Sequence, residues 1–124
     1  MSTLSKPRVA VVGAGSFGRN HLRVIEQSEH AELAGVLDTN GERAAEAAGT
    51  HGCPVLTSLE DLAARADAAV VASPTVTHAP IGCKLMELGM DVMVEKPIAH
   101  SPEAARQLVD TAARNGRVLQ VGHL

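Results

Sequence analysis

The chain has 124 residues, which is enough for one domain with a single core. Hydrophobic residues make up 45%, Phe17 is the only aromatic residue, and the formal net charge is -3 with scattered lysines and arginines. This composition argues against nucleic-acid binding, which needs basic patches or stacking aromatics, and no apolar run is long enough to span a membrane.

The two cysteines, Cys53 and Cys83, lie far apart and form neither a CxxC pair nor a zinc-ligand pattern. We therefore expect reduced thiols. The first residues lack the apolar segment of a secretion signal, which also favours a cytoplasmic protein. The sequence shows no Ser/His/Asp triad and no metal-ligand set, so no metal site is predicted.

Apolar strand segments alternate with helical patterns along the chain. Residues 1–6 are expected to be a disordered lead-in, and residues 7–124 a single domain. Strands are predicted over 8–12, 33–37, 54–56, 68–72, 92–94 and 118–121. Helices are predicted around 18–25, over 40–48, from 58, over 76–88 and over 102–115.

Capping residues support several of these helix boundaries. Asn40 can cap the second helix, with Gly49 as its stop. Ser58 can cap the third helix, and Asp61 three residues later resembles a capping box. The Ser-Pro-Glu segment 101–103 combines a cap, a proline at the first helical position and an acid near the positive end of the helix dipole.

Alternation of helices with near-continuous apolar strands indicates a parallel sheet covered on both faces. We therefore predict an α/β fold with a doubly wound parallel six-stranded sheet of the Rossmann type, in strand order 3-2-1-4-5-6 with right-handed crossovers. In such sheets, ligands bind beyond the carboxyl ends of the strands, near the point where the strand order reverses.

A glycine-rich loop, VVGAGSFG, joins the first predicted strand to the first helix. Gly13 would allow a tight turn, Gly15 would let a pyrophosphate approach the backbone, and Gly18 would let the helix pack close to the sheet. The N–H groups at the helix start would face the phosphates, so Ser16 and Phe17 join the predicted dinucleotide-binding residues. Ser16 is also a candidate helix cap.

The acidic residue Asp38 follows the second predicted strand, twenty residues after Gly18. There it can accept both ribose hydroxyls of an adenosine and would repel a 2′-phosphate, which favours NAD over NADP. A plain turn residue is the alternative. Arg43 could stack on adenine, reach a 2′-phosphate or remain an exposed helix arginine, so NADP stays possible.

The predicted strand 92–94 runs directly into Glu95, Lys96 and Pro97, an unusual end for a buried strand. The strand beside it also ends in a polar segment, residues 72–78. Because the carboxyl ends of parallel strands meet at one sheet edge, both segments are expected to lie where a nicotinamide would bind. Without that context, a lysine at a strand end is usually a solvated residue.

These segments together resemble the Gfo/Idh/MocA oxidoreductases. The matching stretches, in the family's order, are VVGAGSFGRNH, VLDTN, VVASPTVTHAPI, MVEKPIAHS and RVLQVGHL. The resemblance implies a dehydrogenase that transfers hydride between the nicotinamide of NAD(P) and a sugar, polyol or related carbonyl or hydroxyl substrate. The second α/β domain that follows in family members has no counterpart in this sequence.

The same resemblance implies residue roles. Lys96 would be the catalytic residue that polarises the substrate oxygen or assists proton transfer. Glu95 would contact the nicotinamide ribose, and Pro97 would follow a cis peptide bond. The residues lining the cofactor channel would be Ser73, Pro74, Thr75 and His78. The last of these has the alternative of simply beginning the next helix, and His21 is expected at the surface.

We expect the chain alone to bind a dinucleotide with little turnover, because a half-site provides Lys96 but no closing wall. A small-molecule substrate would be a partner only if another domain or chain completed the site. The last strand would be an exposed sheet edge, which favours a homo-oligomer. The alternatives are a non-catalytic dinucleotide-binding or sensing module and an interaction protein on a degenerate Rossmann scaffold. A methyltransferase would fit the glycine loop but not the EKP stretch.

Overall fold

The computed structural model describes residues 6–122, and all but one residue of the expected lead-in 1–6 lie outside them. The elements, in chain order, are β1 (Arg8–Val12), α1 (Ser16–Glu26), β2 (Glu32–Leu37), α2 (Gly41–His51), α3 (Leu59–Arg65), β3 (Ala68–Val71), α4 (His78–Glu87), β4 (Asp91–Glu95), α5 (Pro102–Asn115) and β5 (Leu119–Gly122). A short 3-10 turn, Thr75–Thr77, precedes α4.

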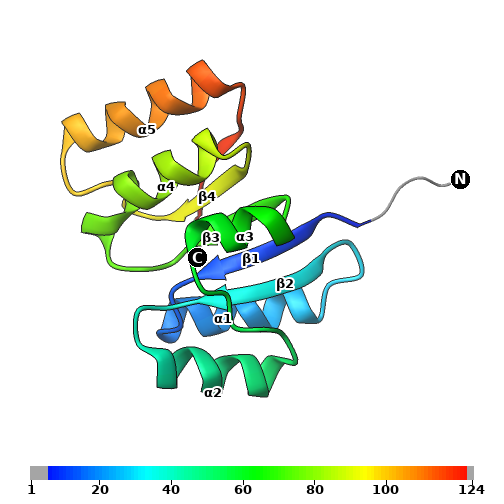
Figure 1. Ribbon diagram of the computed structural model, residues 1–124. Helices are drawn as coiled ribbons and strands as arrows, with labels where there is room; N and C mark the ends of the chain where they lie inside the picture. The colour runs from blue at the N-terminus through cyan, green and yellow to red at the C-terminus, as the bar shows by residue number, and fades with distance from the viewer. Residues whose placement is uncertain (1–5, 123–124) are drawn as a thin grey trace, which may run out of the picture.

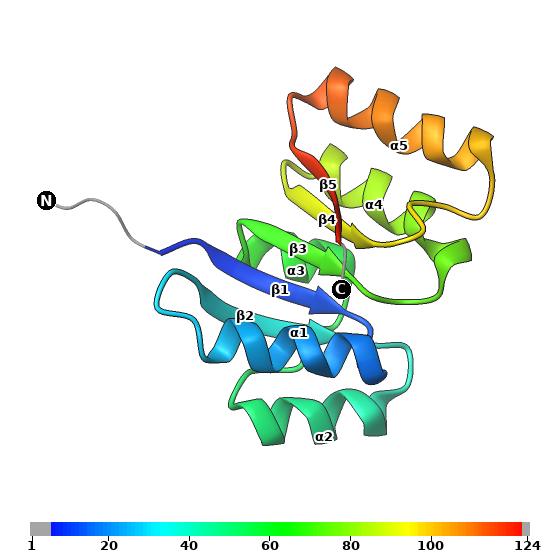
Figure 2. The same cartoon turned by 180° about the vertical axis from the view of Figure 1, so that it is seen from behind.

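The strands form one parallel sheet in the order β2-β1-β3-β4-β5. The order reverses at β1, whose two neighbours are β2 and β3. Figures 1 and 2 show the arrowheads of β1, β3 and β4 pointing to the same side of the molecule. The predicted doubly wound Rossmann fold is therefore confirmed, and the polar segments after these strands share one edge.

The predicted number of strands was wrong, because segment 54–56 forms only an isolated bridge between Val55 and Val36. Leu56 N–H donates to the carbonyl of Val36 at 2.8 Å, and Val36 N–H donates to that of Pro54 at 3.1 Å. The segment thus lies beside β2, where a third strand was expected. It is too short for a ladder, since Pro54 has no N–H and the start of α3 follows closely.

Three of the four predicted helix caps are confirmed. The side chains of Asn40, Ser58 and Ser101 each accept a hydrogen bond from the backbone N–H three residues later, at 3.0, 3.0 and 3.1 Å. Asp61 differs from a regular capping box, because its carboxylate accepts from the N–H of Thr57 rather than from that of Ser58.

Two helix boundaries differ from the prediction. The second helix, α2, continues past Gly49 to His51 and ends at Gly52, which adopts the left-handed conformation with φ 69°. Only a glycine takes this conformation without strain, so Gly52 and not Gly49 ends the helix. The predicted helix over 76–88 is the 3-10 turn followed by α4.

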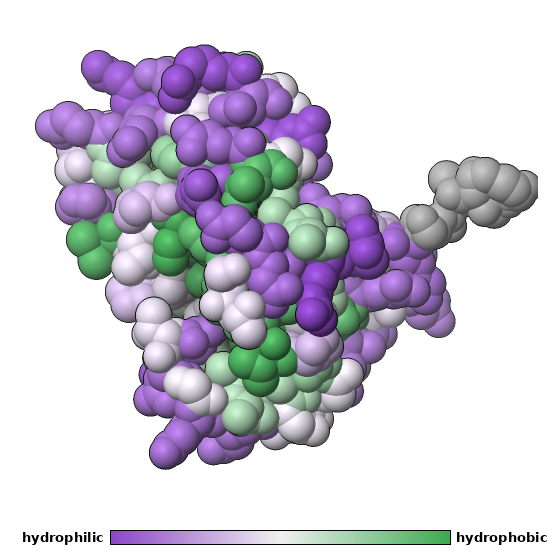
Figure 3. Space-filling view, viewed as in Figure 1, coloured by the Kyte–Doolittle hydropathy of each residue, from purple (hydrophilic) through white to green (hydrophobic). Residues whose placement is uncertain are grey.

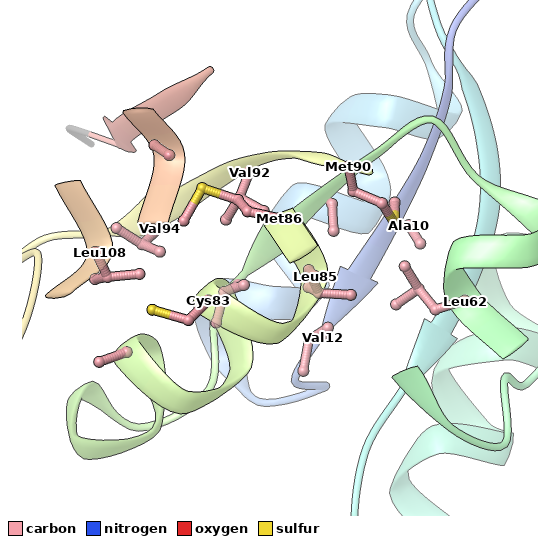
Figure 4. Close-up of a cluster of buried hydrophobic side chains, with 14 of the residues drawn as sticks. Ala10, Val12, Leu62, Cys83, Leu85, Met86, Met90, Val92, Val94 and Leu108 are labelled. Atoms are coloured by element: carbon pink, nitrogen blue, oxygen red, sulfur yellow. The ribbon is translucent and has the colours of Figure 1, made fainter. Parts of the chain in front are cut away.

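Helices cover both faces of the sheet. On one face, Val11, Val36 and Val70 pack with buried residues of α1 and α2. On the other face, Ala10, Val12, Leu62, Leu85, Met86, Val92, Val94 and Leu108 belong to a larger cluster that includes α3, α4 and α5 (Figure 4). Successive strand residues therefore alternate between the two layers, and hydrophilic residues dominate the outer surface over α5 (Figure 3).

Candidate functional site

A cleft of about 960 Å³ lies at the carboxyl ends of β1, β2, β3 and β4. It lies at the point where the strand order reverses, the usual ligand position in this fold. All the predicted site residues line this cleft except Gly18. The topology therefore brings together residues that lie more than eighty positions apart in the sequence.

The glycine loop forms the floor of the cleft between β1 and α1. Gly13 has φ 103°, and its N–H donates to the carbonyl of Leu37 at 2.8 Å. A Cβ at Gly18 would lie 1.8 Å from the carbonyl oxygen of Gly13, so Gly18 packs under the loop instead of lining the cleft. A Cβ at Gly15 would meet nothing within 4 Å. The loop thus leaves space at Gly15 for a ligand to approach the backbone.

Helix α1 begins at Ser16, and Gly15 is its N-cap residue, without a side-chain capping bond. The prediction that Ser16 caps this helix was therefore wrong. The exposed side chain of Phe17 lines the cleft in the first turn of α1. The first N–H groups of a helix have no partners within it, and together with the dipole they favour an anion at this position.

Several hydrogen bonds fix the side chain of Asp38, so it is more than a plain turn residue. Its side chain is only 3% exposed and accepts hydrogen bonds from the N–H groups of Ala14 at 2.7 Å and Asn40 at 2.8 Å. Arg43 adds two further bonds from Nε and Nη2, both at 3.1 Å. Burial raises the pKa of Asp38, but the bonds from Arg43, Asn40 and Ala14 outweigh it, so the pKa lies below its ordinary value. Asp38 therefore carries a charge and fastens the glycine loop to the end of β2.

The segment that follows β3 in the chain, residues 73–78, forms one wall of the cleft. Ser73 and Thr77 share a hydrogen bond between their hydroxyls at 2.7 Å. His78 is 1% exposed, and its ring nitrogens face the carbonyls of Ser73 at 3.0 Å and Ile98 at 3.2 Å. His78 begins α4 and links the segment after β3 to the segment after β4, while Pro74 and Thr75 line the cleft beside it.

Strand β4 ends at Glu95, which is buried, whereas the next residue, Lys96, is exposed; both line the cleft. The Lys96–Pro97 peptide bond is cis, as the family resemblance implied. His21 is also buried and forms a hydrogen-bonded pair with Glu95 through its Nε2. The expectation that His21 lies at the surface was therefore wrong.

Sequence reasoning missed two contributors to this site. His21 lies on the buried face of α1 with Gly18, Leu22 and Ile25, and this helical spacing was the signal that could have found it. Residues 57–59 close the cleft next to Asp38, because the bridge at Val55 places the start of α3 beside β2. No local pattern marks this second group.

Comparison with known proteins identifies the family. The sequence model of an oxidoreductase family with an NAD-binding Rossmann fold, Gfo/Idh/MocA, matches residues 7–123. The chain belongs to the Gfo/Idh/MocA family. It corresponds to the NAD-binding domain of Gfo/Idh/MocA proteins, in agreement with the Rossmann sheet and the residues gathered at its edge.

Several Gfo/Idh/MocA relatives are similar over nearly the whole chain. UDP-N-acetylglucosamine 3-dehydrogenase from Acidithiobacillus ferrooxidans is 36% identical over 94% of this chain, and a solved structure of it superimposes with a TM-score of 0.91 over 97%. Inositol 2-dehydrogenase from Rubrobacter xylanophilus is 37% identical over 94% of this chain. The structure of GenD2 from gentamicin A biosynthesis, solved in complex with NAD, is 34% identical with a TM-score of 0.89 over 98% of this chain.

The chain spans little more than a third of these relatives' length, covering 37% of the first dehydrogenase, 35% of the second and 36% of the GenD2 chain. Within residues 6–122, no helix combines the length and apolar character needed to cross a membrane.

The residues present fit a dinucleotide. A side chain at Gly15 would occupy open space above the loop, which is where a pyrophosphate needs direct access to the backbone. Asp38 lies at the end of β2 and Lys96 at the end of β4, on opposite sides of β1 in the sheet. The accessible backbone at Gly15 thus lies between two polar ends of the cleft.

Proposed function

We propose that this chain is the cofactor-binding part of an NAD-dependent oxidoreductase that acts on a sugar, polyol or related carbonyl or hydroxyl compound. The observation that carries the proposal is the single cleft shared by Gly15, Asp38, Glu95 and Lys96. The printed names of the relatives, which include a nucleotide-sugar dehydrogenase and inositol dehydrogenases, support this substrate class.

The adenosine half of the dinucleotide lies along the β1 and β2 side of the cleft. The pyrophosphate contacts the backbone at Gly13 and Gly15 and the start of α1, with Ser16 and Phe17 beside it. Asp38 accepts hydrogen bonds from the ribose hydroxyls. Arg43 must therefore give up at least one of its two hydrogen bonds to the same carboxylate. The released guanidinium is well placed to stack on adenine or to neutralise a 2′-phosphate, so NADP remains a possible second cofactor.

The nicotinamide half lies over the ends of β3 and β4. Bound NAD supplies the ring that accepts or gives the hydride. Ser73, Pro74 and Thr75 line one wall of this half with His78 behind them, and Glu95 binds the nicotinamide ribose. Lys96, exposed to the cleft, donates a hydrogen bond to the substrate oxygen and exchanges the proton that accompanies hydride transfer.

The substrate site needs a closing wall that these residues do not provide. Hydride transfer needs the reacting carbon held against the ring in a site that excludes water, and the cleft leaves Lys96 exposed. We propose that another domain or chain supplies the closing wall, and that the 124 residues alone bind cofactor with little turnover. A cytoplasmic location is proposed with it, on the strength of two free cysteines.

Calorimetric titration of the purified chain with NADH and NADPH tests the cofactor assignment. Wild type should bind NADH more tightly, and Asp38→Ala should weaken NADH binding more than NADPH binding, because it also removes the repulsion of a 2′-phosphate. Asp67→Ala is the matched control, since Asp67 pairs with Arg8 at the opposite end of the sheet. If a folded chain binds neither dinucleotide, the proposal fails and an interaction module becomes the better hypothesis.

The role of Lys96 is tested in a protein whose substrate site is complete. Lys96→Ala should keep NADH affinity within about threefold and lower the turnover at least about a hundredfold, because acid–base assistance contributes that much. Unchanged turnover would refute this role of Lys96, whereas NADH binding without any turnover in the wild-type protein would favour a dinucleotide-sensing module.

A further inference from the structure

The buried pair His21–Glu95 joins the two functional ends of the cleft. His21 lies on α1, three residues after Gly18, and Glu95 is the last residue of β4. Their side chains are only 11% and 10% exposed, and they share a hydrogen bond between Nε2 and Oε1. Because a carboxylate only accepts hydrogen bonds, Nε2 of His21 donates.

On the β5 side, the carboxylate of Glu95 faces a glycine. Glu95 is the register partner of Gly122 in β5, and a Cβ added at Gly122 would lie 3.6 Å from Oε1 of Glu95. Gly122 therefore leaves room for the carboxylate, which is held from the α1 side by His21 while the residue still lines the cleft. A buried acid keeps a fixed position only where a partner replaces its lost water, and His21 is that partner.

We propose that His21 is a positioning residue for the nicotinamide half of the cofactor. It acts through Glu95, fixing this carboxylate at the cleft wall so that it meets the nicotinamide ribose and keeps the backbone at Lys96 in register. The inference rests on the proposed function, and it adds that α1 serves both ends of the dinucleotide: its first turn contacts the pyrophosphate and its second turn holds Glu95.

Two ligands separate this role from a general contribution to folding. NADH contains the nicotinamide ribose, whereas ADP ends at its second phosphate, lacks that ribose and retains the adenosine and pyrophosphate contacts. His21→Ala should lower NADH affinity about tenfold, the loss expected for one charge-assisted hydrogen bond, and leave ADP affinity within about twofold. Both affinities are measured by calorimetry on the full chain.

The chain offers a matched control in a second histidine–glutamate pair, which joins α2 to the same helix α1. His51 pairs with Glu26 of α1 at 2.8 Å, and neither residue lines the cleft. His51→Ala should therefore leave the ratio of the two affinities unchanged. His21→Gln, which keeps an N–H donor, should recover most of the NADH affinity, whereas His21→Asn should not, because its amide is too short to reach Glu95.

Three results would overturn the inference. NADH affinity could be unchanged in His21→Ala, both ligands could weaken equally, or His21→Asn could match His21→Gln. If His21→Ala does not fold, the Asn and Gln variants provide the same comparison. Failure of the wild-type chain to bind either ligand would instead refute the proposed function, and the inference with it.

Discussion

Gly18 has no room for a side chain, because the position of its Cβ is taken by the carbonyl oxygen of Gly13. Gly15 lies three residues earlier in the same loop and has only open space around it. The two glycines therefore serve different purposes: one permits the packing of α1 against the loop, and the other leaves a surface free for the pyrophosphate.

Substituting alanine at each position should separate these purposes. Gly18→Ala should lower the free energy of unfolding by about 1–3 kcal/mol, because backbone atoms must move to admit the methyl group. Gly15→Ala should change stability by less than about 0.5 kcal/mol but weaken NADH binding at least about tenfold, since the methyl group occupies the cleft. Urea unfolding followed by far-UV circular dichroism and calorimetry measure the two effects. Equal behaviour of the two variants would contradict the assignment.

Asp38 makes stability depend on pH. Its folded-state pKa lies below the ordinary value, because hydrogen bonds from Arg43, Asn40 and Ala14 outweigh the effect of burial. Its contribution to stability is therefore complete above the unfolded-state pKa of about 3.9 and is lost as pH falls through the folded-state pKa. The difference in unfolding free energy between wild type and Asp38→Asn should thus shrink from about pH 6 to about pH 3. Urea titrations across this range measure it, and a constant difference would show that the charge is not responsible.

At the level of elements, the contact of α5 with α4 fixes the layer beside β4. Leu108 of α5 is fully buried, and its Cδ2 lies 2.7 Å from the position that a Cβ at Gly82 of α4 would take. A side chain at Gly82 would therefore require the side chain of Leu108 to shift. The neighbouring residue on α5, Val109, is 52% exposed and points away from this contact.

This arrangement predicts unequal costs for two adjacent truncations. Leu108→Ala should lower the free energy of unfolding by about 2–5 kcal/mol, because it leaves a cavity between α4, α5 and the sheet. Val109→Ala should change it by less than about 0.5 kcal/mol. Urea unfolding of the two variants checks the difference, and similar losses would place α5 in the wrong orientation.

At the level of the whole molecule, β5 is an exposed edge strand of the sheet. It pairs with β4 and ends the strand order among residues 6–122, and Val118 and Val121 are 62% and 41% exposed. Unpaired strand edges with apolar side chains favour pairing with another chain. We propose a homo-oligomer formed through this edge.

Light scattering over a wide concentration range tests the oligomer. The wild-type mass should rise above that of a monomer at high concentration, and Val121→Lys should suppress the rise by placing a charge at the edge. Val109→Lys adds the same charge on α5, away from β5, and should leave the association unchanged. A monomer at every concentration would refute the proposal.

Local patterns predicted most of the architecture. The caps at Asn40, Ser58 and Ser101 formed as predicted because each needs only a backbone N–H three residues away. The prediction of a strand over 54–56 was wrong. Its apolar residues resemble a strand, but Pro54 and the short distance to α3 limit the segment to a bridge. Gly49 was overread as a helix stop, because a glycine ends a helix only where the backbone turns left-handed, as it does at Gly52.

By itself, the sequence determined the alternation of strands and helices, the glycine loop after β1 and the polar residues that follow β2, β3 and β4. These features depend on spacing and on a few neighbouring residues, and the rule that parallel strands end at one edge then assembles the cleft. The tertiary structure alone decided that Asp38 is buried and fastened to Ala14, and that His21 pairs with Glu95 across 74 positions. These contacts depend on how the glycine loop and α1 pack on the completed sheet, and no short stretch of sequence predicts that packing.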